Sequence, residues 1–203
     1  LALVFALSLG LAAGVISALH RQSLIDVSVM AIATVGMAVP NFWLASVCIV
    51  IFAFVFHIVP AAGWGSISHV ILPALCLGAP YAAYIARLTR TGMLDVLHLD
   101  YIRTAYAKGL LTPTVVTRHA IKGAVLPVVS FIGPATAGIL TGSLVLEKIF
   151  NIPGMGSHFI KAAFQRDYPL EMGVVLVYTI LLFSMNTLVD IAYSVLDPRV
   201  NLE

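Results

Sequence analysis

The 203-residue chain has few charged residues, since Asp, Glu, Lys and Arg make up 10% of it, against about 25% in soluble domains. Its apolar runs are correspondingly long: 61% of the residues are hydrophobic and the mean hydropathy is +1.04. This scarcity of charge excludes an ordinary soluble domain. The near balance of 11 basic and 9 acidic residues also argues against a nucleic-acid binder. The composition therefore predicts a membrane protein.

Catalytic and metal-binding motifs are also missing from the sequence. It has no G-x-x-x-x-G-K-[ST] phosphate loop, so any ATP hydrolysis must belong to another polypeptide. Its two cysteines, Cys48 and Cys76, fall inside apolar runs, where a thiol usually behaves as a small hydrophobe. The six histidines form no pair at helical spacing and no cluster with Cys or acidic residues, which predicts no metal site. An intramembrane hydrolase is the enzyme alternative, but GWGS lacks the G-x-S-x-G frame and we assign no catalytic residue.

Five segments are apolar enough to cross a bilayer, which needs about 20 residues. They are Leu1–Leu19, Val27–Phe56, Ile67–Ala86, Val125–Leu146 and Met172–Leu196. The second is longer than one perpendicular span requires, and Pro40 is its expected kink because proline cannot donate the helical hydrogen bond. The chain opens at Leu1 inside an apolar run, without Met or a basic region, so we expect a fragment that lacks its N-terminal part.

The distribution of Lys and Arg among the loops predicts the orientation, because cytoplasmic loops hold the excess. The 87–124 loop has six of them, while the 20–26 link and the C-terminal tail have one each. The opposite side has three, all in the 147–171 loop. The 87–124 loop and the C-terminus are therefore expected in the cytoplasm, and the 147–171 loop outside it.

The 87–124 loop is expected to contain two helices separated by a glycine. No Gly or Pro occurs from Leu94 to Lys108, and one helical face carries Leu94, Leu97, Tyr101 and Ala105, as on a helix that lies against an apolar surface. A second face carries Leu99, Arg103 and Tyr106 and is a candidate docking surface. Gly109 then ends this helix, and a new one is expected with Thr112 as N-cap and Pro113 at the first helical position. The alternative is an amphipathic loop helix that rests on lipid headgroups.

Motifs that follow one another along nearly the whole chain resemble the permease subunits of ATP-binding-cassette importers, in their peptide and nickel branch. In the cytoplasmic loop these are DYIRTAYAKGL (100–110) and the segment from RHA to LP (118–127), and Arg103, Thr104 and Ala105 occupy the positions of the family's Glu-Ala-Ala motif. The others are VPNFWLA (39–45), VPAAGWGS (59–66), ILPAL (71–75), ARLTRTGMLDVL (86–97), EKIFNIPGMG (147–156), RDYP (166–169) and VDIAYSVLDPR (189–199).

The resemblance implies an all-α, polytopic transmembrane bundle of the type I importer (MetI-like) kind, formed by residues 1–203 as a single permease domain in the bacterial inner membrane. The implied partners are a second permease chain, as a homo- or heterodimer, two cytoplasmic ATP-binding subunits, an extracytoplasmic substrate-binding protein and membrane lipid. ATP and Mg²⁺ would be bound by the ATPase subunits, so this chain needs no cofactor of its own. The implied cargo is di- or oligopeptides, with nickel as the alternative.

The resemblance also implies roles for particular residues. The coupling helix would contact the ATPase through Leu99, Asp100, Arg103, Thr104, Ala105, Tyr106, Lys108 and Gly109. Structural or gating roles fall to Pro40, Pro127, Pro153, Gly154, Gly156 and Asp190. The outer PGMG turn, a short amphipathic helix over Ser157–Gln165 and the RDYP corner would form a docking surface for the binding protein or an outer gate; an interfacial packing helix is the alternative.

A secondary transporter or channel driven by an ion gradient is the alternative from a different class. Such a carrier is expected to show internal repeats and paired charges inside the membrane. The sequence shows no repeat and essentially one charge inside a span, Asp190, which is expected to be a structural partner for a basic loop residue such as Arg118. A proton relay at Asp190 is the other interpretation.

Overall fold

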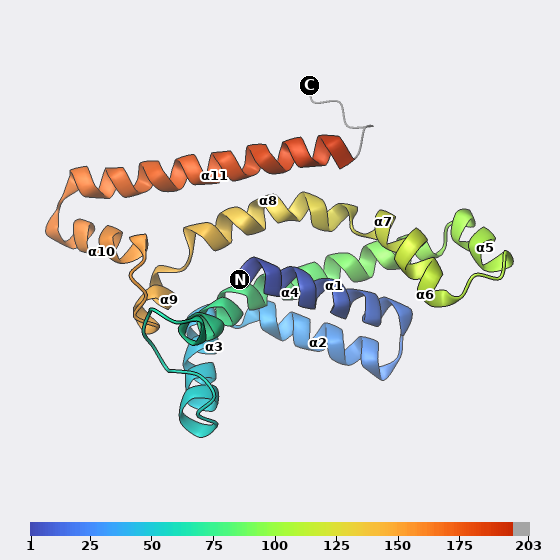
Figure 1. Ribbon diagram of the computed structural model, residues 1–203, viewed down its shortest axis with the longest axis horizontal. Helices are drawn as coiled ribbons and strands as arrows, with labels where there is room; N and C mark the ends of the chain where they lie inside the picture. The colour runs from blue at the N-terminus through green and yellow to red at the C-terminus, as the bar shows by residue number, and fades with distance from the viewer. Residues whose placement is uncertain (197–203) are drawn as a thin grey trace.

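The computed structural model describes residues 1–196, without the side chains of 141, 189, 190 and 192–196, and this described part is built from helices joined by turns (Figure 1). The long helices are α1 (Ala2–Leu19), α2 (Leu24–Ala38), α4 (Ile67–Leu97), α8 (Leu126–Thr141) and α11 (Tyr168–Leu196). The shorter ones are α3 (Asn41–Cys48), η1 (Ile49–Val55), α5 (Asp100–Ala107), α6 (Thr112–Val115), η2 (Val116–Ala120), α7 (Ile121–Ala124), α9 (Leu144–Ile149) and α10 (Met155–Gln165). The all-α prediction is confirmed.

Within the described residues, three helices, α1, α4 and the first part of α11, are each long and apolar enough to span a membrane. Two bent pairs of helices raise the number of spans to as many as five. One pair is α2 with α3 and η1, bent by 109°, and the other joins Thr112–Ala124 to α8, bent by 56°. Three of the five expected spans are thus single helices, and the other two are present only if each bent pair counts as one broken span.

The largest helix contact, between α1 and α4, depends on two glycines of α1. A Cβ atom at Gly10 would lie 2.7 Å from the Ala82 carbonyl oxygen, and one at Gly14 would lie 2.6 Å from the Ala86 carbonyl oxygen. Glycines four residues apart lie on one helix face and let two backbones approach closely in a membrane. The G-x-x-x-G spacing in LGLAAGV thus allows α1 and α4 to pack closely against each other.

Pro40 does more than kink the second expected span. The break expected at Pro40 is present, and its 109° bend places α3 and η1 across the axis of α2. Val39 is extended (ψ 125°), as a residue before proline prefers, and Pro40 is the N-cap of α3. The chain therefore changes direction at Pro40, and α3 packs against α4 and α9.

Two other expected boundaries also differ from the structure. The third span does not end at Ala86, because α4 continues through 31 residues to Leu97. The fourth ends at Thr141 rather than Leu146, because Gly142 (φ +66°) adopts a left-handed conformation that stops α8 before α9 begins.

Figure 1 shows the 87–124 loop, with α5 and α6, at one end of the bundle and α9 and α10 at the opposite end. We call these the α5 end and the α10 end. At the α5 end, buried residues of α1, α4 and the loop helices form one apolar cluster: Ala18, Met93, Val96, Ile102, Ala105, Val115, Val116, Ala120 and Ala124. This cluster joins the loop to the long helices, so the loop is packed against the bundle rather than free.

Candidate functional site

The short helix α5 ends in a well-formed cap that fixes how it protrudes from the bundle. Gly109 has φ +80°, its N–H donates to the Tyr106 carbonyl at 2.9 Å, and the Leu110 N–H donates to the Ala105 carbonyl at 3.3 Å. This pair of bonds is the Schellman motif, which needs a residue in the left-handed conformation. Leu110 then packs against the α5-end cluster, which contains Ala105. Gly109 thus ends the helix, as the sequence predicted.

The buried face of α5 consists of Ile102 and Ala105, which are 0% and 5% exposed. Ala105 was expected on the packed face and was also assigned to the ATPase contact by the resemblance; its side chain is covered by the bundle in this chain, so it lies on the packed face. Tyr101 was expected to hold α5 to the bundle; its side chain is 46% exposed and its hydroxyl lies beside Gly123 of α7, while Ile102 is the fully buried residue. Leu94 and Leu97 do pack against the α5-end cluster, but as part of α4.

These differences have one physical cause, a break in the helix expected over Leu94–Lys108. α4 ends at Leu97, Leu99 is extended (φ −75°, ψ 150°) and caps α5, and α5 starts at Asp100. A new helix therefore starts at Asp100. Residues of α5 no longer share a face with Leu94 and Leu97, as they would on one continuous helix. The next helix also starts one residue earlier than expected, with Leu111 rather than Thr112 as N-cap.

The opposite face of α5 is open and carries the predicted docking residues. Leu99 and Tyr106 are 47% and 42% exposed, and the side chain of Arg103 is 73% exposed. Arg103 Nη1 lies 3.4 Å from Asp100 Oδ1, a pair too exposed to hold much energy. The other exposed residues of this face are Thr104, Lys108 and Gly109. Of the predicted docking residues, all but Ala105 are accessible to a partner.

A partly buried ion pair, with Asp26 covered and the Arg90 side chain 26% exposed, braces α4 behind the α5 end. Arg90 Nε lies 2.7 Å from Asp26 Oδ1, and Arg90 Nη2 lies 2.8 Å from Asp26 Oδ2, a two-point geometry that suits guanidinium and carboxylate. Asp26 is only 3% exposed and also accepts from the Ser17 hydroxyl and, at 2.9 Å, from the Gln22 N–H. One carboxylate thereby ties together the end of α1, the turn after it, α2 and α4.

Sequence reasoning missed this pair, since it placed Asp26 in a polar link and counted essentially one charge inside the spans. The available signal was Ser23 three residues before Asp26, because a Ser followed at that distance by an acidic residue marks a helix start. Ser23 is indeed the N-cap of α2, accepting from the Asp26 N–H. Asp26 therefore belongs to the first turn of α2, where it faces Arg90.

At the α10 end, the glycines of the PGMG turn make room for a carboxylate. A Cβ atom on Gly154 would overlap the Glu147 carboxyl group, and one on Gly156 would lie 2.8 Å from Glu147 Oε2. Gly154 is the N-cap of α10, so the carboxylate lies beside the positive end of that helix. Pro153 precedes the cap in the non-helical link from α9. The turn thus brings α10 onto Glu147, and the expected helix over Ser157–Gln165 is confirmed within α10.

Replacing Gly154 by Ala is expected to lower the free energy of unfolding by about 2 kcal/mol, since the added methyl must displace the Glu147 carboxyl group. Thermal unfolding of the purified protein in detergent measures this. Adding Glu147→Ser should restore most of the loss. Gly173→Ala is the matched control, because a Cβ there meets nothing within 4 Å. Equal stability of Gly154→Ala and wild type would contradict the role of the glycine.

The remaining predicted structural residues lie at breaks or outside the described side chains. Pro127 is in the first turn of α8, directly after the 56° bend that separates the loop helices from this span. Asp167 accepts from the Leu170 N–H at 3.2 Å and so caps α11 at the RDYP corner. Asp190 lies in α11, but its side chain is outside the described residues, so its pairing with Arg118 stays a prediction.

Comparison with known proteins agrees with this arrangement. The family model described as "Binding-protein-dependent transport system inner membrane component" matches residues 10–202. The chain belongs to this family. Its members are components of the inner membrane, which agrees with the candidate spans in the structure. The match runs through the α5 end, the α10 end and the long helices alike.

Two curated relatives are similar over almost the whole chain. It is 47% identical over 201 residues to the dipeptide transport system permease protein DppB of Bacillus subtilis, covering 99% of this chain and 65% of that protein. It is 43% identical to the oligopeptide transport system permease protein OppB of Escherichia coli K12, covering 98% of this chain and 66% of that protein. The chain thus spans about 65% of the length of these relatives.

The fold is also found in a solved transporter structure. A chain of the structure titled "Inward facing conformations of the MetNI methionine ABC transporter" superposes with a TM-score of 0.80. The match covers 97% of this chain and 89% of the other at 16% sequence identity, so it speaks for the fold alone. The MetI-like architecture expected from the sequence is confirmed.

Proposed function

We propose that this protein is the transmembrane permease subunit of an ATP-driven, binding-protein-dependent importer of di- or oligopeptides. The family match and the names of the relatives support the class of transporter and its cargo. The observation that carries the proposal is α5, a capped helix with a packed inner face and an open outer face formed by Leu99, Arg103 and Tyr106. A rigid helix with an unpartnered amphipathic face suits docking to another protein.

In this proposal α5 is the coupling helix that lies in a cleft of a cytoplasmic ATPase subunit. ATP and Mg²⁺ bind to that subunit, and this chain holds no cofactor of its own. When the ATPase subunits close, α5 moves with them, and its packing through Ile102 and Ala105 passes the motion to the bundle. α4 leads from the α5 end back into the bundle, braced by Asp26. ATP thus shifts the balance between inward-open and outward-open states.

The proposed assembly contains a second permease chain, two ATP-binding subunits and an extracytoplasmic binding protein. The excess of Lys and Arg in the 87–124 loop supports an orientation with the α5 end and the C-terminus in the cytoplasm. The α10 end then faces outward, where α10 and the RDYP corner offer a docking surface for the binding protein or an outer gate. Lipid surrounds the rest of the bundle.

Peptides are preferred over nickel as cargo because both relatives quoted above are named for peptide transport. Cells that lack the gene for this protein are expected to lose uptake of a labelled dipeptide, to regain it when the full-length protein is restored, and to take up ⁶³Ni²⁺ unchanged in either case. Loss of ⁶³Ni²⁺ uptake with unchanged dipeptide uptake would contradict the cargo assignment and leave the permease role in place.

A further inference from the structure

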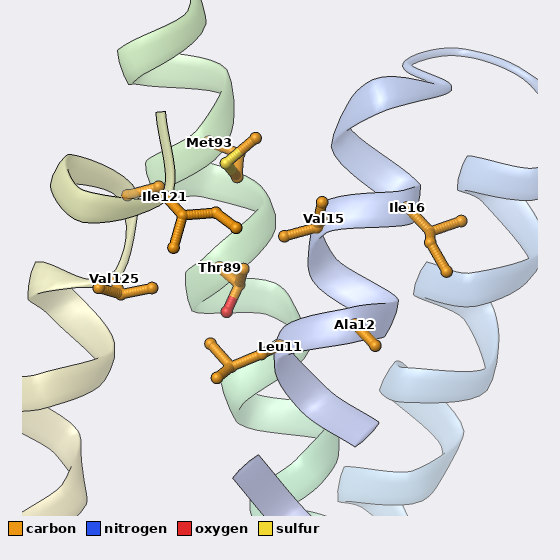
Figure 2. A pocket seen from close by; sticks show the side chains of 9 residues that line it. Leu11, Ala12, Val15, Ile16, Thr89, Met93, Ile121 and Val125 are labelled. Carbon is orange, nitrogen blue, oxygen red and sulfur yellow. The ribbon is translucent and has the colours of Figure 1, made fainter. Parts of the chain in front are cut away.

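Two polar contacts tie the turn between α1 and α2, and the start of α2, to α4. The first is the pair of Asp26 with Arg90 described above. The second lies about two helical turns further along α4, where Arg21 Nη1 is 3.3 Å from His98 Nε2. Another side of α4 lines an apolar groove of about 290 Å³ with α1 and the α7–α8 junction (Figure 2). This part of α4 is thus held by polar contacts on the side of the turn and by apolar packing elsewhere.

The Arg21–His98 contact lies at the joint between α4 and α5. His98 is the C-cap of α4, and Leu99 is extended and is the N-cap of α5. Arg21 comes to this joint from 77 positions away in the chain. The contact therefore restrains the point at which the chain turns from the long helix α4 into the protruding helix α5.

The chemistry of the two side chains makes this contact dependent on the charge of His98. An arginine side chain is always protonated and only donates hydrogen bonds, so His98 Nε2 must be the acceptor and its ring must be neutral. A protonated ring carries a hydrogen on both nitrogens, so two donors and two positive charges would face each other. Histidine is the side chain that ordinarily changes charge between about pH 5 and 8. The contact is thus present with neutral His98 and is lost as the pH falls.

Other charged groups around the joint do not replace Arg21 as the partner of His98. Asp95 of α4 and Asp100 of α5 favour a protonated ring, but both are exposed, so water screens their charge. Asp100 also lies 3.4 Å from Arg103. The remaining charged or titratable side chains of the turn, of α5 and of the helices packed on this end of α4 are basic or phenolic, or belong to the Asp26–Arg90 pair: His20, Tyr101, Tyr106, Lys108, Arg118, His119 and Lys122.

We propose that the Arg21–His98 contact is a pH-sensitive restraint on the joint between α4 and α5, closed while His98 is neutral and released when acid on the α5 side protonates it. Released, the joint lets α5 change its angle to α4 more freely. Motion of α5 is then passed less completely to the bundle, so acid lowers the uptake obtained per ATP. This effect on uptake rests on the proposed function, whereas the release of the joint does not.

His98→Gln tests the restraint, because glutamine places an acceptor oxygen where His98 has Nε2 and does not take up a proton. Amide hydrogen exchange is measured by mass spectrometry on the full-length protein with its transport partners, at about pH 7.5 and about pH 6. Wild type and variant are compared at the same pH, which removes the effect of pH on intrinsic exchange. Peptides from residues 99–108 should exchange equally at the neutral pH. At the acidic pH they should exchange about threefold faster in wild type, as for one exposed hydrogen bond lost.

Two more variants complete the test. Arg21→Ala lacks the donor, so residues 99–108 should exchange about threefold faster than in His98→Gln at both pH values. His20→Gln is the matched control, since His20 is also exposed in the turn but its Nδ1 lies 2.9 Å from the Ile16 carbonyl of its own helix. This control should keep the response of wild type to acid.

The same proteins in vesicles give the effect on transport. Dipeptide uptake per ATP hydrolysed should fall in wild type at the acidic pH and stay constant in His98→Gln. Equal exchange of wild type and His98→Gln at the acidic pH, an equal difference at both pH values, or loss of the acid response in His20→Gln would overturn the restraint. If exchange behaves as expected but no variant takes up dipeptide, the restraint stands and the proposed function is wrong.

Discussion

The double variant Arg103→Glu with Tyr106→Ala is expected to retain the fold and to bind the ATPase subunits at least about thirtyfold more weakly. Both side chains lie on the open face of α5, Arg103 73% and Tyr106 42% exposed, and neither belongs to the α5-end cluster. Arg and Tyr are the residue types that most often dominate interfaces, where one such side chain contributes about 2 kcal/mol. Co-purification with the ATPase subunits and ATP-coupled dipeptide uptake both measure the loss.

A matched control carries the same kinds of change to the opposite end of the molecule. Lys148→Glu with Phe164→Ala also reverses one charge and removes one aromatic ring, from residues that are exposed at the α10 end. This variant should bind the ATPase subunits as wild type does. If the α5 variant kept ATPase binding, or if both variants lost ATPase binding equally, α5 would not be the docking helix.

Replacing Asp26 by Ala is expected to lower the free energy of unfolding by about 2 kcal/mol, because it leaves the partly buried Arg90 without its counter-charge. The change also removes the acceptor of the Ser17 hydroxyl and of the Gln22 N–H, so α1, α2 and α4 lose a common link. Thermal unfolding in detergent and the yield of folded protein in the membrane measure the effect.

Two further variants test whether the loss of stability comes from the Asp26–Arg90 pair or from removing any negative charge. Asp100→Ala removes the partner of an exposed pair, since the Asp100 side chain is 96% exposed, and should change stability little. Asp26→Leu with Arg90→Met removes both charges of the pair and should be more stable than Asp26→Ala alone, as found when ion pairs are replaced together by apolar residues. Equal effects of Asp26→Ala and Asp100→Ala would contradict the bracing role of Asp26.

Much of the fold followed from the sequence because long uncharged runs and local caps are local signals. The apolar stretches predicted α1 and α11 with ends within a few residues, and Gly109 was identified as the end of α5. The open face of α5 was also predicted, because Leu99, Arg103 and Tyr106 follow one another at spacings of four and three residues, which places them on one side of a helix.

The rest depended on contacts between residues far apart in the chain. Asp26 and Arg90 are separated by 64 positions, and only the crossing of α2 with α4 brings them together. The burial of Ala105 and Ile102 depended on the break at His98 and Leu99, where no Gly or Pro marks the end of a helix. The sharp turn at Pro40 was foreseen as a kink, but its size depends on packing of α3 against α4 and α9.

The central claim is that an ATPase moves this chain by acting through α5. The most direct test is to measure which source of energy drives uptake. The complete transporter would be reconstituted in vesicles with the binding protein and a labelled dipeptide, with or without ATP on the α5 side, and with ionophores that abolish ion gradients. The account predicts uptake that requires ATP on that side, persists with ionophores and is lost in Arg103→Glu with Tyr106→Ala. Uptake without ATP that is abolished by ionophores would contradict it and would indicate a gradient-driven carrier.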